Sequence, residues 1–178
     1  MMLKKIIFLL MLIPLSINLK AQTDSTYWKN MALEVASELE LTFRDRNFKA
    51  YAQLNHPKLV EMMGTVDDFA QMMEEQMAQI EVEAKIDSID FGVPFNFVKC
   101  EKSINCLLPQ TLIMSVSDSL SLKSVVYLLG ISEDSGNTWY FIDASNGEEF
   151  LDAIIPNRCK IFVIPKKEEE FIRTYKND

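Results

Sequence analysis

The hydrophobic period of this chain changes once, near Ala84. Before that residue, apolar side chains recur every three or four positions, which is the spacing of an amphipathic helix. After it, β-branched and aromatic residues take over with a period near two, which is the pattern of β-strands. Helices followed by strands predict an α+β domain in which N-terminal helices pack on a curved, mostly antiparallel sheet.

Two long helices are predicted from apolar stripes, one along 28–43 and one along 66–84. Thr65 and Asp68 have the spacing of a capping box at the start of the second helix. The two stripes are expected to pack on a common surface.

Two short helices are predicted between the long ones, over 48–54 and 57–63. Pro57 suits the first turn of a helix and pushes the preceding residue, His56, out of helical geometry. Gly64 suits the end of the same helix.

Six strands are predicted at about 85–91, 95–100, 106–116, 121–132, 138–143 and 159–164. The fourth is apolar on both of its faces, and such a strand is expected at the centre of a sheet, covered on both sides. Residues 147–154 predict a short helix, and residues 165–178 predict a charged, partly frayed tail.

The string from Ser132 to Trp139 fits S-x-D-x-G-x-T-W, the pattern of an Asp-box turn. The carboxylate of Asp134 can accept hydrogen bonds from backbone N–H groups two and three residues on, and Gly136 supplies a positive φ. Trp139 is expected to begin the next strand. The motif resembles the repeats of sialidase-type β-propellers, but this chain is too short for the blades of a propeller. A carbohydrate-associated accessory module is therefore an alternative that rests on this turn alone.

The N-terminal residues 1–21 have the pattern of a secretory signal peptide, with Lys4 and Lys5 before an apolar run and a predicted cleavage site after Ala21. That run is shorter than the roughly 20 residues that span a bilayer. No cysteine lies near the cleavage site, which disfavours a lipoprotein. We expect a periplasmic or secreted protein whose residues 22–178 form a single domain.

The chain is acidic, with a formal charge of −8. Removing residues 1–21 removes three lysines and no acidic residue, which leaves −11. A surface of this sign disfavours nucleic acid and anionic membranes as partners.

The three cysteines leave two alternatives open. Cys100 and Cys106 can form a disulfide in an oxidising compartment if their segments form a hairpin, or both can be small buried residues. Cys159 is predicted to lie in a strand. A metal site is disfavoured, because the chain has one histidine and no C-x-x-C motif.

Several segments resemble known proteins. The run Phe48–Tyr51, the run His56–Gly64 and the Met-rich helix that follows resemble the opening of the NTF2-like (SnoaL-like) cone fold. Pro109–Thr111, Ile131–Asp143 and Phe162–Pro165 together resemble a group of uncharacterised exported proteins of Gram-negative bacteria. The resemblance implies a pocket between helices and a concave sheet. It implies no particular activity, since this fold hosts isomerases, dehydratases, ligand carriers and subunits that only bind.

Enzymes with this fold usually place an acid or histidine base beside a tyrosine in that pocket. The chain offers these residue types at His56, Asp143, Tyr51, Tyr127 and Tyr140, without a matching catalytic string. His56 precedes Pro57, where local capping is its expected role. We predict no catalytic, cofactor-binding or metal-binding residue.

Methionines and acidic residues are the remaining concentrations. Thioether side chains adapt to irregular apolar ligands, although core packing is the simpler role for methionines at helical spacing. The methionines in question are Met62, Met63, Met72, Met73 and Met77. The acids Asp143, Glu148, Glu149 and Asp152 match no calcium loop and are expected on a solvated face.

The leading hypothesis is an exported, non-catalytic domain that binds a small apolar ligand or a protein partner, with a homodimer through the sheet as one arrangement. The alternative from another class is a small lyase or isomerase with His56 or Asp143 as base. That alternative requires one of these two side chains to enter a pocket beside a tyrosine hydroxyl.

Overall fold

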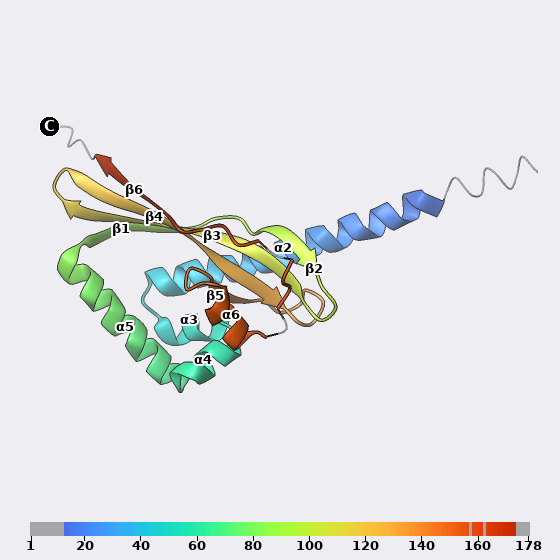
Figure 1. Cartoon of the computed structure of the whole chain (residues 1–178), viewed down its shortest axis with the longest axis horizontal. Helices are drawn as coiled ribbons and strands as arrows, with labels where there is room; N and C mark the ends of the chain where they lie inside the picture. The colour runs from blue at the N-terminus through green and yellow to red at the C-terminus, as the bar shows by residue number, and fades with distance from the viewer. Residues whose placement is uncertain (1–12, 157, 162, 174–178) are drawn as a thin grey trace, which may run out of the picture.

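The computed structural model describes residues 13–156, 158–161 and 163–173 and has the predicted α+β architecture (Figure 1). In chain order, the described elements are α2 (Ile13–Arg44), α3 (Phe48–Leu54), α4 (Pro57–Met63), α5 (Val66–Glu83), β1 (Lys85–Phe91), β2 (Phe95–Lys99), β3 (Ile104–Ser117), β4 (Leu120–Ser132), β5 (Tyr140–Asp143), α6 (Glu148–Ile154) and β6 (Glu168–Arg173).

The helical part follows the local signals of the sequence. Helices α3 and α4 have the predicted bounds, and α4 ends at Gly64, whose φ is 114°. At the start of α5, the backbone N–H of Asp68 donates to Thr65 Oγ1 at 3.2 Å, and Thr65 N–H donates to the Asp68 carboxylate at 2.8 Å. The predicted capping box is therefore confirmed.

Helix α2 begins earlier than its apolar stripe predicts, at Ile13 rather than near residue 28. The predicted signal peptide lies partly in residues 1–12, which are outside the described residues. Its remainder, 13–21, forms the start of α2. Cleavage after Ala21 stays a prediction.

Two long antiparallel strands, β3 and β4, form the centre of the sheet. Two short strands, β1 and β2, share the outer edge of β3. The outer edge of β4 is shared in the same way, because β5 pairs with residues 128–131 and β6 with residues 120–125. Residues Val126 and Tyr127 of β4 fall between these two partners.

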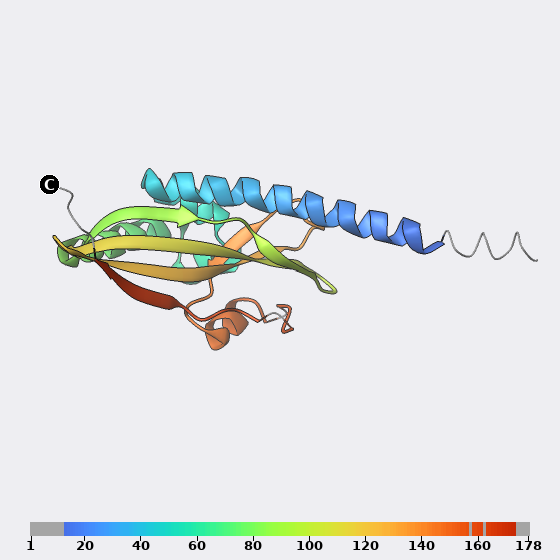
Figure 2. The ribbon, with the colours of Figure 1, turned by 90° about the horizontal axis from the view of Figure 1, so that it is seen from above.

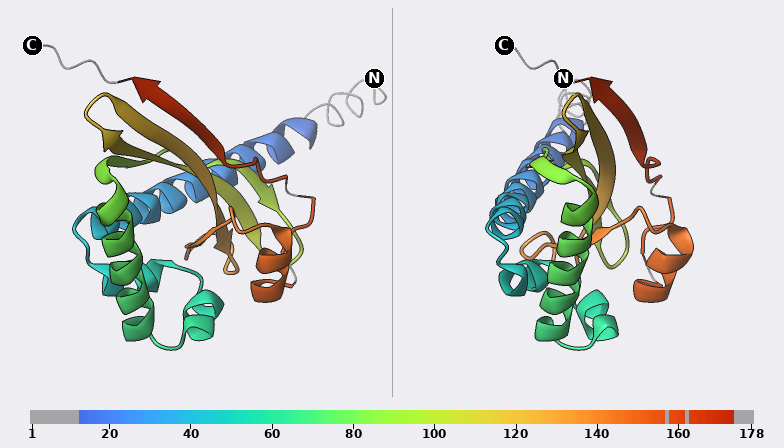
Figure 3. Two further views of the ribbon diagram at one scale, coloured as in Figure 1. Left: turned by 60° about the vertical axis from the view of Figure 1, so that its left-hand side comes forward. Right: turned by 90° about the vertical axis from the view of Figure 1, so that its left-hand side faces the viewer.

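The sheet is covered unequally along its length. Helix α2 lies on one side of it and α6 on the other (Figures 2 and 3). The second half of β4, including Leu128, Leu129 and Ile131, is fully buried, whereas its first half is mostly half-buried. The prediction that β4 is central is confirmed, and its coverage on both sides is complete only at this end.

The Asp-box string forms the predicted turn between β4 and β5. The Asp134 carboxylate accepts from the backbone N–H groups of Asn137 at 3.1 Å and Thr138 at 2.8 Å, which are three and four residues on rather than two and three. Burial works to raise the pKa of Asp134, but these hydrogen bonds and that of Ser132 outweigh it and hold the pKa below its usual range.

Helix α2 docks on this turn. Tyr27 donates its hydroxyl hydrogen to Asn137 Oδ1 at 2.7 Å, and Trp28 lies directly against Gly136. Trp139 is 2 % exposed, and its indole N–H donates to Gly136 O at 3.0 Å. The turn thus attaches the first helix to the sheet, and its tryptophan is not an exposed aromatic surface.

The prediction for the last strand is wrong. The chain is not extended in a strand over 159–161 or 163–164, and residue 162 lies outside the described residues. The strand is β6, within the predicted tail, where Lys123 of β4 donates to Glu170 at 2.9 Å. Most side chains of β6 are exposed, so its sequence carries no burial period that would indicate a strand.

The disulfide between Cys100 and Cys106, one of the two alternatives left open by the sequence, does not form, although the hairpin does. Strands β2 and β3 pair Lys99 with Ile104, so the N–H of Cys100 donates to Ser103 O at 2.8 Å. In that register Cys106 lies too far along β3 to face Cys100, and its neighbour is Gly130 on β4.

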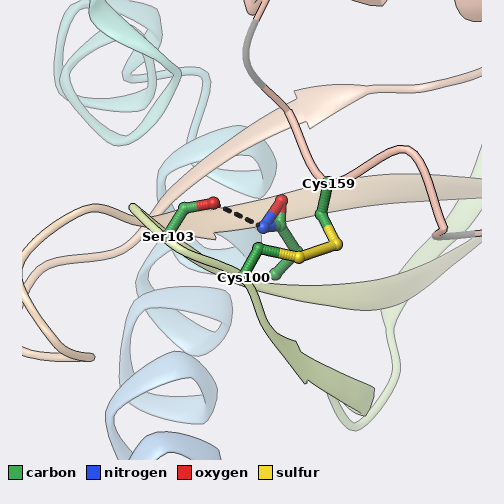
Figure 4. Close-up of a disulfide and its surroundings, with 4 residues drawn as sticks. Cys100, Ser103 and Cys159 are labelled. Carbon is green, nitrogen blue, oxygen red and sulfur yellow. Dashed lines mark hydrogen bonds between the residues drawn. A yellow bond between two sulfur atoms is a disulfide. The ribbon is translucent and has the colours of Figure 1, made fainter.

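The disulfide joins Cys100 to Cys159, two residues separated by 59 positions (Figure 4). Cys159 lies in the segment that follows α6, not in a strand. The bond therefore ties the C-terminal segment to the end of β2. Cys106 is a free, buried cysteine, and its burial raises the pKa of its thiol.

Candidate functional site

A cavity of about 500 Å³ lies between the helices α3, α4 and α5 and the sheet. Its helical wall is built by the apolar face of α5, which turns toward the sheet because its methionines recur at helical spacing. Its sheet wall is built by alternate residues of β3 and β4, including Leu112 and Val126. A pocket of roughly 300–1,000 Å³ with mostly apolar walls is of the size that holds a small organic ligand.

The methionines predicted to pack the core also line this cavity. Met63, Met72, Met73 and Met77 contribute to its wall, and Met77 is 6 % exposed. Met62, in contrast, is 55 % exposed and lies outside the lining. The methionines of α5 therefore serve both in packing and as an apolar cavity wall, whose shape the flexible thioethers can adjust.

One end of the cavity is polar. Tyr51 of α3 and Asn55, which follows α3, line the cavity with Asp143, the last residue of β5, and with Ser145 and Asn146 of the loop that follows. These segments are far apart in sequence. They meet because the end of α3 joins β5 through an isolated parallel bridge between Asn55 and Phe141, supported by a hydrogen bond from the next N–H, that of His56, to Phe141 O at 3.0 Å.

The hydroxyl of Tyr51 stays protonated. Its side chain is almost completely buried, and this desolvation, followed by the charge of Asp143, raises the pKa of Tyr51. Asp143 is half-buried, and its Oδ1 accepts from Ser145 N–H at 2.7 Å. Among the described residues, this is the one hydrogen bond that reaches the Asp143 carboxylate. The carboxylate therefore has room for a further donor.

Two further lining residues come from the segment that joins β5 to β6. Between β5 and β6, the lining passes to Phe150 of α6 and to Lys167, which directly precedes β6. The Lys167 ammonium pairs with Glu169 at 2.7 Å. Among the described lining residues, Asp143 and Lys167 are the two that carry charge.

A second hollow of about 350 Å³ adjoins the cavity between the ends of α2 and α5 and strand β1. It shares part of its wall with the cavity, including Phe43 and Met77. An ion pair between Arg46 and Glu81 lies at this hollow. The hollow therefore adjoins the cavity through apolar residues and adds charged ones, such as Arg44 and Asp87, to the surface beside it.

The structure separates the candidate acid–base residues. Tyr51 and Asp143 line the cavity, whereas His56, Tyr127 and Tyr140 do not. The Nδ1 atom of His56 accepts from Lys58 N–H at 3.3 Å and so caps α4, as its position before a proline predicts. The rings of His56 and Tyr140 lie 6.2 Å apart. Tyr127 points to the opposite face of β4 from Val126.

The acidic residues of α6 have a structural partner. Arg158, whose side chain is 2 % exposed, donates to Asp152 at 2.7 Å and pairs with Glu148 at 3.2 Å. Lys160 also pairs with Asp152, and its hydrogen bond is the largest cause that lowers the pKa of this carboxyl. Within the described residues, no three histidine, cysteine or acidic side chains converge to hold a metal ion.

Some lining residues carry no signal in the sequence. Lys167 lies in the predicted tail, and Asn55 is an ordinary polar residue at a helix end. Gln110 and Ser124 line the cavity from β3 and β4. The alternation of polar and apolar residues along a strand shows which side chains share a face of the sheet. Which of the two faces a helix covers follows only from the assembled fold.

The pKa of His56, which is lowered in the folded protein, predicts a pH dependence of stability. Burial is the main cause that lowers it, with Lys58 acting in the same direction and Glu133 and Glu61 opposing. The folded state thus favours the neutral ring, so the unfolded chain binds more protons between the folded pKa and about 6.5. This contribution to stability is complete above about 6.5 and is lost as the pH falls to the folded pKa.

We expect His56→Asn to remove this part of the pH dependence, because asparagine is a good N-cap residue that does not titrate. His56 is the one histidine of the chain, so no other imidazole contributes. The measurement is the free energy of unfolding of both proteins from neutral to mildly acidic pH. Parallel profiles in the two proteins would contradict the expectation.

No protein-family model, no curated protein and no solved structure matches the chain. Within the described residues, no helix has the length and apolar character needed to cross a membrane.

Proposed function

We propose that this protein is an exported NTF2-like domain that binds a small apolar ligand in the cavity between its helices and its sheet, and that it catalyses no reaction. Export rests on the pattern of residues 1–21, and the family rests on the resemblance of its sequence segments. A protein partner, including a second copy docked through the sheet, remains a prediction of the sequence.

One observation carries the proposal of a small ligand. The cavity of about 500 Å³ has largely apolar walls from Met72, Met73, Leu112 and Val126, yet it is not filled by side chains. Empty apolar space forfeits the dispersion contacts that a packed core makes. An apolar ligand would regain these contacts, and the flexible methionines would let the wall follow its shape.

We expect Val126→Phe to weaken the binding of a neutral apolar fluorophore, N-phenylnaphthylamine, by at least about tenfold, because the larger ring occupies the cavity. The measurement is a fluorescence titration. The matched control is Val125→Phe, which adds the same ring to the same strand on the opposite face. Equal affinities in the wild type and both variants would mean that the fluorophore binds elsewhere, and a wild type that binds no fluorophore would remove the proposal.

A second function has one observation in its favour. Tyr51 and Asp143 line the same cavity, which is the arrangement that a small lyase or isomerase needs, with Asp143 as base and Tyr51 as hydrogen-bond donor. The test is proton exchange from enolisable ketones into deuterated water, followed by NMR. Exchange that Asp143→Asn abolishes would favour the enzyme over the binding domain. If none of the tested ketones exchanges its protons, enzymatic enolisation of these ketones is excluded.

A further inference from the structure

The cavity wall has a polar part and a larger apolar part. Its polar part includes Tyr51, Asn55 and Asp143, while Met73 and Met77 belong to its apolar part. A fully apolar ligand that covered Asp143 would bury the carboxylate without giving it a further donor beside Ser145 N–H, which costs free energy. The ligand that fits the whole cavity therefore has an apolar body and a polar head.

The hydrogen bonds of the Asp143 carboxylate indicate the chemistry of the ligand's polar head. The carboxylate of Asp143 accepts a single hydrogen bond among the described residues, from Ser145 N–H. Its remaining lone pairs are free for a donor from the ligand. Hydrogen bonds between ionised partners are shorter and roughly twice as strong as neutral ones, so an ammonium satisfies this carboxylate better than a hydroxyl.

Lys167 is the charged group that opposes this assignment. Its side chain is 47 % exposed, and its ammonium already pairs with Glu169 at 2.7 Å. Solvent screens its charge, so its repulsion of a bound cation is weak. The chain as a whole carries a formal charge of −8, which attracts a cation and repels an anion.

We infer that the cavity takes a small amphipathic amine, with its apolar body along the methionines of α5 and its ammonium group on the carboxylate of Asp143. The inference rests on the proposed function, since it names the class of ligand for the same cavity. Asp143 is half-buried, so an ammonium group on its carboxylate would remain near water.

The test ranks three straight-chain probes of equal length, a primary alkyl amine, the alcohol and the carboxylate, by their displacement of N-phenylnaphthylamine from the full chain. We expect the amine to bind about tenfold more tightly than the alcohol, as one charge-assisted hydrogen bond provides. The carboxylate should bind most weakly. This ranking is measured on the wild type and needs no variant to fold.

Variants then locate the preference. Asp143→Asn should bring the ratio of amine to alcohol affinity close to one, whereas Glu149→Gln, which removes an exposed carboxylate outside the cavity lining, should leave that ratio as in the wild type. Lys167→Met should maintain or increase the preference for the amine.

The outcomes separate the two proposals. If the fluorophore binds and the three probes displace it equally, or if the carboxylate binds most tightly, the amine assignment is overturned while the apolar cavity site stands. If the amine preference survives in Asp143→Asn, its cause lies elsewhere and the assignment is again overturned. If neither fluorophore nor any probe binds, the proposed function itself is lost.

Discussion

Replacing Gly136 by alanine is expected to lower the free energy of unfolding by about 4 kcal/mol, because two costs add at this position. The residue has a φ of 93°, which strains any residue with a Cβ atom. An added Cβ would also lie 2.3 Å from Cδ1 of Trp28, so the ring and the helix that carries it must move. The measurement is chemical denaturation of both proteins.

Gly147 offers a matched control. Its φ is 91°, almost the same as that of Gly136, but an added Cβ would meet no atom within 4 Å. We expect Gly147→Ala to cost about 2 kcal/mol, from backbone strain alone. The difference between the two variants measures the docking of α2 on the Asp-box turn. Equal losses would show that Trp28 moves aside freely and that the turn does not hold the helix.

Breaking the disulfide is expected to lower the free energy of unfolding by about 4 kcal/mol, from the loop-closure entropy of the unfolded chain. The bond joins Cys100 and Cys159 across 59 positions, and long loops lose the most entropy when they are closed. The measurement compares denaturation of the oxidised protein with that of the reduced protein and of the variant Cys100→Ser/Cys159→Ser.

The double variant is also the control for the reductant. A reducing agent should change the stability of the wild type and leave the variant unchanged, because Cys106 is unpaired. If the reductant has no effect on the wild type, or if the double variant is as stable as the oxidised protein, the bond does not contribute to the fold in the way that we expect.

The elements with local signals could be predicted from the sequence. Pro57 and Gly64 mark the ends of a helix by their own backbone preferences, and the capping box of Thr65 involves residues three positions apart. Likewise, the period-two segments gave the positions of β1 to β5 to within a few residues. Such features depend on residues that are close together in the sequence, so they can be predicted from the sequence alone.

The features that were missed depend on pairing between distant segments. Strand β6 is identified by its partner on β4, since its own side chains are mostly exposed. The disulfide depends on the register of the hairpin, in which Val98 pairs with Asn105 and Cys100 lies opposite Ser103. A shift of that register by three residues would have been needed to bring Cys106 opposite Cys100.

The candidate site was predicted in its parts but not in its assembly. The sequence indicates that the methionines of α5 could form an apolar wall, and it offers Tyr51 and Asp143 among several residues of the types that an enzyme with this fold uses. That these two share one cavity follows from the bridge between Asn55 and Phe141, which no local pattern indicates. His56, the most obvious candidate by chemistry, serves instead as a helix cap.

The division of one strand edge between β5 and β6 has a consequence for how the cavity wall can vary. At Val126 the edge of β4 passes from one partner to the other, while its opposite edge stays paired with β3. The segment that joins β5 to β6 supplies Phe150 and Lys167 to the cavity lining. Substitutions in this segment can therefore alter the cavity wall during evolution while the central strands keep their register.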